Sequence, residues 1–161
     1  MISKNGFVCW LLWAVALLPL TASAQVPAEL RALEEALGWL TLVDTGQYGE
    51  SHTQMSPLFR NSVKRSDWIA SMKGLRRGTG ELQNREVQDS FITQELPDHP
   101  PGTYCLVKFQ SDWGGIDYLL AEIVILELTP EGWRTLGYYV NPANSSPEAG
   151  AAGAPKAPSA P

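Results

Sequence analysis

The stretch Leu37–Ser51 reads Leu-Gly-Trp-Leu-Thr-Leu-Val-Asp-Thr-Gly-Gln-Tyr-Gly-Glu-Ser, and it carries the end of an apolar helix into a turn. Around it, apolar residues recur at helical spacing on two neighbouring stripes, which predicts a helix packed inside a domain. The stripes are Leu30, Leu33, Leu37 and Leu40, and beside them Ala32, Ala36, Trp39 and Val43. Asp44 falls within the same arc, so one carboxylate is expected to point toward the core.

The first residues have the features of a secretory signal peptide, which we place at residues 1–24. Lys4 precedes an apolar run over Phe7–Leu18, and a small-x-small cleavage pattern ends at Ala24. The alternative is an uncleaved membrane anchor, but the run is shorter than the roughly 20 residues that span a bilayer. We therefore expect cleavage between Ala24 and Gln25, an exported chain in the periplasm or outside the cell, and no membrane attachment afterwards.

Length, charge and cysteine content narrow the class of protein. The chain has 161 residues, which suits one domain of ordinary size. Its net charge is −5 and it has no long run of Lys or Arg, which argues against a nucleic-acid partner. Without the signal peptide, Cys105 is the single cysteine, so packing and not a disulfide must stabilise the domain. Because Cys105 alternates with apolar residues in a strand pattern, its thiol is expected to be inert.

Apolar spacing predicts three helices before residue 80. They are a helix from about Pro27 to Asp44 that Gly46 ends, a shorter helix over 50–59 whose regularity Pro57 limits, and a third that has Ser66 or Asp67 as its N-cap and carries Trp68 and Met72.

From Leu82 onward the spacing becomes strand-like and predicts a four-stranded meander with a tight turn at 129–132. After residue 140 the composition is mostly Pro, Ala, Gly and Ser, so we expect a single domain over 25–140 and a disordered tail over 141–161. The predicted class is α+β: three N-terminal helices packed on a curved antiparallel sheet, cystatin-like or cone-like, with a pocket at the wide end.

Several ordered motifs resemble family 4019 of the domains of unknown function, which consists of exported bacterial proteins, over roughly residues 27–140. They are Trp39-Leu40, Val43-Asp44, Gly46, Tyr48, Phe59, Trp68, Arg76, Gly80, Arg85, Leu96-Pro97, Gly102, Tyr104, Gly132-Trp133-Arg134 and Gly137-Tyr138-Tyr139. This chain departs from the family pattern at His52, where Trp is common, and at Gly78, where Pro is common. The resemblance implies a cone-shaped fold related to nuclear transport factor two. Proteins of that fold include ligand binders, interaction modules and a few enzymes, so the resemblance implies no reaction.

Asp44, Tyr48 and His52 are the candidate catalytic residues because they stand four residues apart. On an unbroken helix they would line one face as acid, hydroxyl and imidazole, a group suited to proton transfer. The glycines between them favour a broken helix, and a buried aspartate more often pairs with an arginine. Arg76 and Arg85 are the expected partners of Asp44. Either arginine could instead bind the carboxylate of a ligand.

Aromatic residues provide the remaining candidates for ligand contact. Trp68, Tyr138 and Tyr48 could line a ligand pocket, although packing in the core is the commoner role. Trp113 precedes two glycines in a predicted loop, where an exposed ring would be an interaction site.

No metal-ligand spacing, phosphate-binding loop or dinucleotide fingerprint occurs in the sequence, so we expect no metal and no cofactor. The sequence favours an exported, non-catalytic module that binds a small ligand or an envelope protein. The alternative is a small cone-fold enzyme that performs proton-transfer or hydrolytic chemistry with Asp44 as base.

Overall fold

The computed structural model describes residues 26–143, which form helices followed by a four-stranded sheet. The elements are α1 (Ala28–Asp44), α2 (Tyr48–Thr53), α3 (Pro57–Ser62), α4 (Arg65–Leu75), β1 (Leu82–Thr93), β2 (Tyr104–Trp113), β3 (Leu120–Thr129) and β4 (Gly132–Pro142). The predicted signal peptide, its cleavage site and the tail after residue 143 lie outside the described residues.

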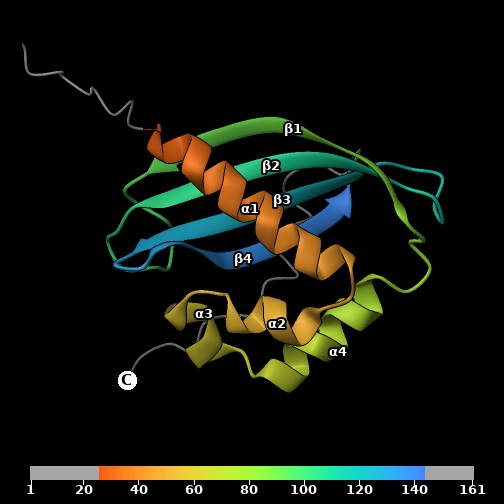
Figure 1. The fold of residues 1–161 in the computed structure, drawn as a ribbon, viewed down its shortest axis with the longest axis horizontal. Coiled ribbons are helices and arrows are strands. Elements are labelled where there is room, and N and C mark those ends of the chain that lie inside the picture. Colours follow the sequence, from red (N-terminus) through yellow and green to blue (C-terminus); the bar gives the residue numbers. More distant parts are fainter. Residues whose placement is uncertain (1–25, 144–161) are drawn as a thin grey trace, which may run out of the picture.

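The sheet is antiparallel and runs in the order β1-β2-β3-β4. The described helices lie on one side of it, with α1 laid across the sheet and α2, α3 and α4 gathered beyond α1 (Figure 1). Register shifts between Val87 and Asp89 and between Ile125 and Leu126 mark bulges, which bend a sheet locally. The predicted α+β class, with helices on a curved antiparallel sheet, is confirmed.

Helix α1 has the bounds that the sequence predicts, but it buries only part of the predicted arc. The fully buried residues are Ala32, Ala36, Trp39, Leu40 and Val43. Leu30 and Leu37, which the spacing predicts in the core, are 45% and 41% exposed. Small alanines let the helix approach the sheet closely, and of the leucine stripe Leu30 and Leu37 lie at the margin of the interface while Leu40 is fully buried.

The predicted second helix over 50–59 is wrong, because the structure has two short helices there. Pro57 has no backbone N–H to donate and stands at the first position of α3, a place where proline fits. Ser56 caps this helix by accepting a hydrogen bond from the Phe59 backbone N–H at 3.3 Å. The Ser56 backbone N–H donates to the Thr135 carbonyl at 2.8 Å, so the segment between α2 and α3 is also bonded to β4.

Helix α4 begins earlier than predicted. Lys64 is the N-cap residue, and the backbone N–H groups of Asp67 and Trp68 donate to its carbonyl at 3.0 and 3.1 Å. The Ser66 hydroxyl instead donates to the Asp67 carboxylate at 3.0 Å, so neither residue is the cap.

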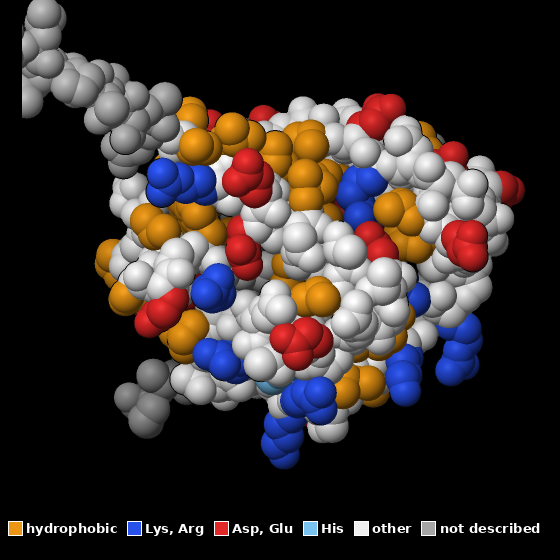
Figure 2. Space-filling view, viewed as in Figure 1, with side chains coloured by type: hydrophobic (Ala, Val, Ile, Leu, Met, Phe, Trp, Pro, Cys, Tyr) orange, Lys and Arg blue, Asp and Glu red, His pale blue; other side chains and the backbone are white. Residues whose placement is uncertain are grey.

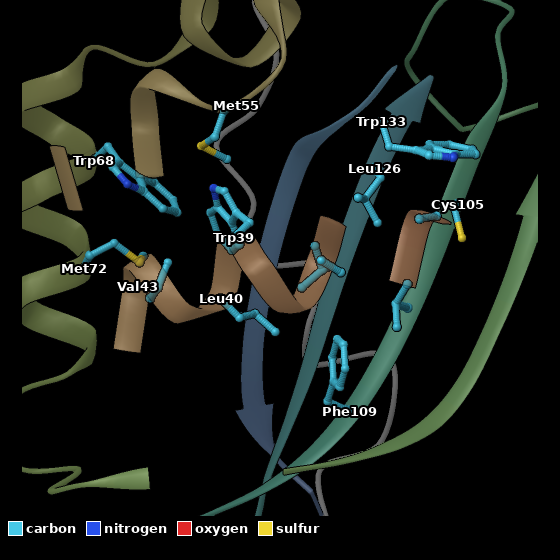
Figure 3. Close-up of a cluster of buried hydrophobic side chains, with 14 residues drawn as sticks. Trp39, Leu40, Val43, Met55, Trp68, Met72, Cys105, Phe109, Leu126 and Trp133 are labelled. Atoms are coloured by element: carbon cyan, nitrogen blue, oxygen red, sulfur yellow. The ribbon is translucent and has the colours of Figure 1, made fainter. Parts of the chain in front are cut away.

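Two tryptophans from α1 and α4 hold the helices together in the core (Figure 3). The Trp39 ring N–H donates to the Ser51 carbonyl at 3.0 Å, and the Trp68 ring N–H donates to the Ser51 hydroxyl at 3.0 Å. The two ring centroids lie 5.9 Å apart, and the Trp39 centroid lies 5.4 Å from that of Tyr138. Trp68, a candidate for ligand contact, is therefore part of the core, at 5% exposure.

Strand β4 is longer than the sequence predicts. Asn141 pairs with Ala121 and Pro142 pairs with Leu120, so the predicted start of the disordered tail at residue 141 is wrong by at least two residues. Proline lacks the N–H of a sheet ladder, but β4 is an edge strand and this position is its last residue, where proline is tolerated.

A close backbone approach joins the end of α4 to the end of β2. Gly80 has a φ of +73°, and a Cβ at this position would lie 2.5 Å from the Gly115 nitrogen. The Gly115 N–H donates to the Thr79 carbonyl at 2.8 Å, which fixes the two turns together. A side chain at residue 80 would separate them.

Gly80→Ala is therefore expected to lower the free energy of unfolding by about 2 to 3 kcal/mol, from left-handed backbone strain together with the clash. Gly78→Ala is the matched control, because Gly78 has a φ of +84° and no atom lies within 4 Å of the place that its Cβ would occupy. Its expected cost is about 1 kcal/mol. Urea melts measure both, and equal costs would show that the close approach contributes nothing.

Candidate functional site

Asp44, the last residue of α1, meets two arginines from different elements. Its Oδ2 lies 2.6 Å from Arg85 Nη1, and its Oδ1 accepts from Arg85 Nη2 at 3.0 Å. Arg76, directly after α4, donates to the same Oδ1 at 3.1 Å. Both arginine side chains are only 8% exposed and that of Asp44 is 15% exposed. The predicted pairing of Asp44 is confirmed, with both expected partners.

Glu122, from the middle of β3, adds a second carboxylate whose side chain is fully buried. It accepts from Arg85 Nη2 at 3.1 Å and from the hydroxyls of Ser111 and Tyr138. The Tyr138 hydroxyl also accepts from Arg76 Nη2 at 2.8 Å. We call Asp44, Arg76, Arg85, Glu122 and Tyr138 the ion cluster. Its two positive and two negative charges balance.

The charges in the ion cluster stabilise one another against burial. Burial alone raises the pKa of Glu122, but the charge of Arg85 and the hydrogen bonds from Ser111 and Tyr138 outweigh it, so that pKa is lowered. Burial alone lowers the pKa of Arg85, but its hydrogen bond to Asp44 and the nearby carboxylates raise it overall. Burial and the charge of Glu122 raise the pKa of Tyr138. At neutral pH, Glu122 is therefore a carboxylate, Arg85 a guanidinium ion and Tyr138 a neutral phenol.

Trp113 forms a wall of the ion cluster, so its prediction as an exposed interaction site is wrong. It is the last residue of β2 and is 2% exposed. The Arg76 guanidinium carbon lies 4.0 Å from the centroid of the Trp113 ring, a cation–π contact. Sequence reasoning placed Trp113 in a loop because two glycines follow it, but β2 extends through it before the turn.

The three candidate catalytic residues, Asp44, Tyr48 and His52, contact different parts of the structure. Asp44 binds arginines, whereas the His52 Nε2 lies 2.8 Å from the Val63 carbonyl oxygen and the His52 ring packs edge-on against Phe59. The helix breaks between Asp44 and Tyr48, where Gly46 has a φ of +75°. Tyr48 then begins α2 and packs at the margin of the core. The structure therefore does not align the three residues on one helical face.

Two open hollows lie along α1, away from the ion cluster. One of about 430 Å³ is lined by residues of α1 and by Gln54, and the other, of about 520 Å³, lies between the start of α1 and the β3–β4 turn. Arg31 and Glu35 line both. Neither is lined by a residue of the ion cluster.

Within residues 26–143, no group of three or more His, Cys, Asp or Glu side chains is placed to hold a metal ion. No helix in this part of the chain is long and apolar enough to cross a membrane.

One known protein family matches the part of the chain that carries the site. The profile of a family described as a protein of unknown function, DUF4019, matches residues 35–138, which include every residue of the ion cluster. The chain belongs to the DUF4019 family.

The DUF4019 domain is also similar to a solved structure, a candidate dehydratase of the NTF2-like family from Streptomyces avermitilis. The identity is 12% and the TM-score is 0.46, with 73% of this chain and 99% of that chain covered. A likeness of this size carries no conclusion about a reaction. A search of curated proteins gave no match.

Sequence reasoning missed Glu122 and Ser111 as members of the site of this DUF4019 domain. In the sequence, Glu122 stands out only as a polar exception in an apolar strand. Its spacing carried a usable signal, because it shares the buried face of β3 with Leu120, Val124 and Leu126. A carboxylate on a buried face requires a partner, and Arg85 was available.

Acidification should weaken the DUF4019 domain through Glu122. Because its pKa is lowered in the folded protein, Glu122 binds protons more readily when the chain is unfolded. Its contribution to stability is present at neutral pH and is lost as the pH falls below its ordinary value of 4.5 and through the folded pKa. Urea melts between pH 7 and pH 3 should show this loss.

Glu122→Gln is the matched variant for that experiment, since it keeps the shape of the side chain and removes the titration. It should be less stable than the wild type at pH 7 and should lose less stability on acidification. If both proteins lose the same amount between pH 7 and pH 3, Glu122 does not contribute.

Proposed function

We propose that this DUF4019 domain is an exported, non-catalytic module that binds a small ligand or a segment of an envelope protein. The observation that carries the proposal is the state of Asp44, whose two oxygens both accept hydrogen bonds from arginines. A general base needs a carboxylate that is free to take a proton from a substrate. Proton transfer by Asp44 would require it to leave Arg76 and Arg85.

The balanced charge of the ion cluster supports the same conclusion. A ligand carboxylate that bound Arg85 would have to displace Asp44 or Glu122, and either would then be a buried charge that has lost a partner. The cluster is better suited to fix the end of α1 against α4, β1 and β3 than to bind an anion. We therefore place ligand binding outside it.

The N-terminal sequence supports export, as the spacing of Lys4, the apolar run and Ala24 is typical of a secretory signal. Determination of the N-terminus of the exported protein by mass spectrometry tests this part. We expect Gln25 as the first residue. A chain that keeps Met1 and remains in the membrane fraction would contradict it.

The binding role is tested by a thermal-shift screen of the protein against a library of small metabolites and short peptides. A binder present at 100 times its Kd stabilises a protein by about 2.7 kcal/mol. We expect a binder whose effect is lost in Arg31→Ala, which lines both hollows, and is kept in Arg77→Ala, an exposed arginine outside them. Chemical turnover of a binder that stops in a folded Asp44→Asn variant would overturn the proposal in favour of an enzyme.

A further inference from the structure

Strand β1 leaves one edge of the sheet unpaired. Within residues 26–143, β1 pairs only with β2, whereas the opposite edge strand, β4, receives the Ser56 backbone N–H at its Thr135 carbonyl. The register of β1 shifts between Val87 and Asp89 and is then regular over Asp89–Thr93. An unpaired, regular strand edge offers backbone donors and acceptors to another chain.

Exposed apolar side chains lie beside this edge, on the face that α1 covers. Val87 and Ile92 pair with Phe109 and Cys105, two residues that point into the core, so they share the core face of β1. They are nevertheless 46% and 38% exposed, because β1 extends past the margin of α1.

Helix α1 adds two leucines to this surface. Glu29 accepts from the Ser90 hydroxyl at 2.7 Å, and Asp44 binds Arg85, so the stripe of α1 that carries these acids lies toward β1. Leu30 and Leu37 stand next to that stripe and are 45% and 41% exposed. Figure 2 shows hydrophobic side chains gathered over α1 and β1. We call Leu30, Leu37, Val87 and Ile92 the apolar shelf.

The charge around the apolar shelf is negative. Residues 81–95 contain four carboxylates and one basic residue, Arg85, which is held in the ion cluster. Exposed Glu29 adds a carboxylate on the α1 side. Lys108 lies 3.6 Å from Asp89 and offsets one of these charges. A bound segment would therefore meet an apolar surface with acidic surroundings.

We propose that the edge of Asp89–Thr93 and the apolar shelf bind an extended segment of another polypeptide, with alternating apolar side chains and Lys or Arg at its ends. Main-chain hydrogen bonds to β1 would continue the sheet, as in other cases of strand addition. Alternate side chains of the bound segment would pack on the apolar shelf. The side chains between them would lie beside Phe91, on the opposite face of the sheet. This inference rests on the proposed binding function and names its partner class.

Charge distinguishes this partner from a second copy of the chain. Two β1 edges brought together would place the carboxylates of residues 81–95 against those of the same segment, and like charges across a strand pair destabilise it. A segment with Lys or Arg at its ends places opposite charges there instead. The acidic edge therefore favours a basic partner over self-association.

The test uses the full exported protein and a fluorescent synthetic peptide in which Val and Ile alternate with Ser and Thr between terminal lysines. We expect binding by fluorescence anisotropy and slower hydrogen exchange of the backbone amides of residues 89–93. Ile92→Lys and Leu30→Lys should each weaken binding at least tenfold. Leu128→Lys, the matched control, changes a leucine that is 46% exposed near the β3–β4 turn and should leave affinity within twofold.

Two control peptides test the chemistry of the partner. A peptide with proline at its centre should not bind, because proline interrupts a regular strand. A peptide with terminal Glu in place of Lys should bind at least tenfold more weakly at low salt. The inference is overturned if the lysine peptide does not bind, if exchange slows elsewhere but not at 89–93, or if the protein dimerises through β1 in sedimentation experiments. If the screen yields small-molecule binders while this peptide fails, the proposed binding function stands and the partner class is wrong.

Discussion

Arg85→Ala is expected to lower the free energy of unfolding by about 3 to 5 kcal/mol, because it removes the side chain that donates hydrogen bonds to both carboxylates of the ion cluster. Arg85 donates to Asp44 at 2.6 Å and to Glu122 at 3.1 Å, and it is only 8% exposed. Glu122 would stay buried with less of its charge compensated. Since small domains have total stabilities of about 5 to 15 kcal/mol, the variant should be close to unfolding at 25 °C.

Urea denaturation followed by tryptophan fluorescence measures this loss. Arg134→Ala is the matched control, because Arg134 pairs with Glu35 at 3.6 Å in a half-exposed position and should cost only about 0 to 1 kcal/mol. Arg85→Lys keeps the charge but not the fork of donors, so its cost should fall between the two. A result in which Arg85→Ala and Arg134→Ala melt alike would show that the ion cluster does not hold the fold together.

Trp39→Ala is expected to cost about 3 to 5 kcal/mol, since it removes the largest fully buried side chain and leaves a cavity between α1 and α4. Trp39 is 1% exposed and its ring packs against those of Trp68 and Tyr138. Loss of this ring also leaves the Ser51 carbonyl without the ring N–H that it accepts at 3.0 Å.

Trp39→Phe separates the two contributions, because it keeps an aromatic ring and removes the hydrogen bond. Its cost should be smaller than that of Trp39→Ala by at least about 1 kcal/mol. Leu37→Ala is the matched control on the same helix and should stay within about 0.5 kcal/mol of the wild type, because Leu37 is 41% exposed. Equal unfolding midpoints for Trp39→Ala and Leu37→Ala would contradict the core described above.

The sequence predicted the pairing of Asp44 because helical geometry is local. The azimuth of Asp44 follows from its spacing to Leu33 and Leu37, and a carboxylate near the core needs a cation. Arg76 and Arg85 were the expected cations. The pairing of β3 with β4 was likewise predictable, since a tight turn at Gly132, where φ is +110°, joins them as a hairpin.

Features that depend on distant contacts were not predictable in this way. Glu122 belongs to the site only because β3 pairs with β2 in the register that sets it beside Ser111 and Arg85. The burial of Trp113 depends on Arg76, which lies on another element. Tertiary packing decides both.

The same limit explains the errors in the helices. A wide apolar arc does not show which of its stripes will face the sheet, and the structure selects the alanine stripe over Leu30 and Leu37. The sequence predicted Pro57 to be an irregularity within one helix. In the structure Pro57 begins α3, and the Ser56 N–H before it donates to the Thr135 carbonyl of β4.

A double-mutant cycle on Asp44 and Arg85 tests most directly whether Asp44 has a structural role and is not a free base. The free energy of unfolding is measured by urea melts for the wild type, Asp44→Ala, Arg85→Ala and the double variant. We expect that the two losses are not additive, with a coupling of about 1 to 3 kcal/mol. Losses that add to within about 0.5 kcal/mol, with Asp44→Ala melting like the wild type, would contradict it.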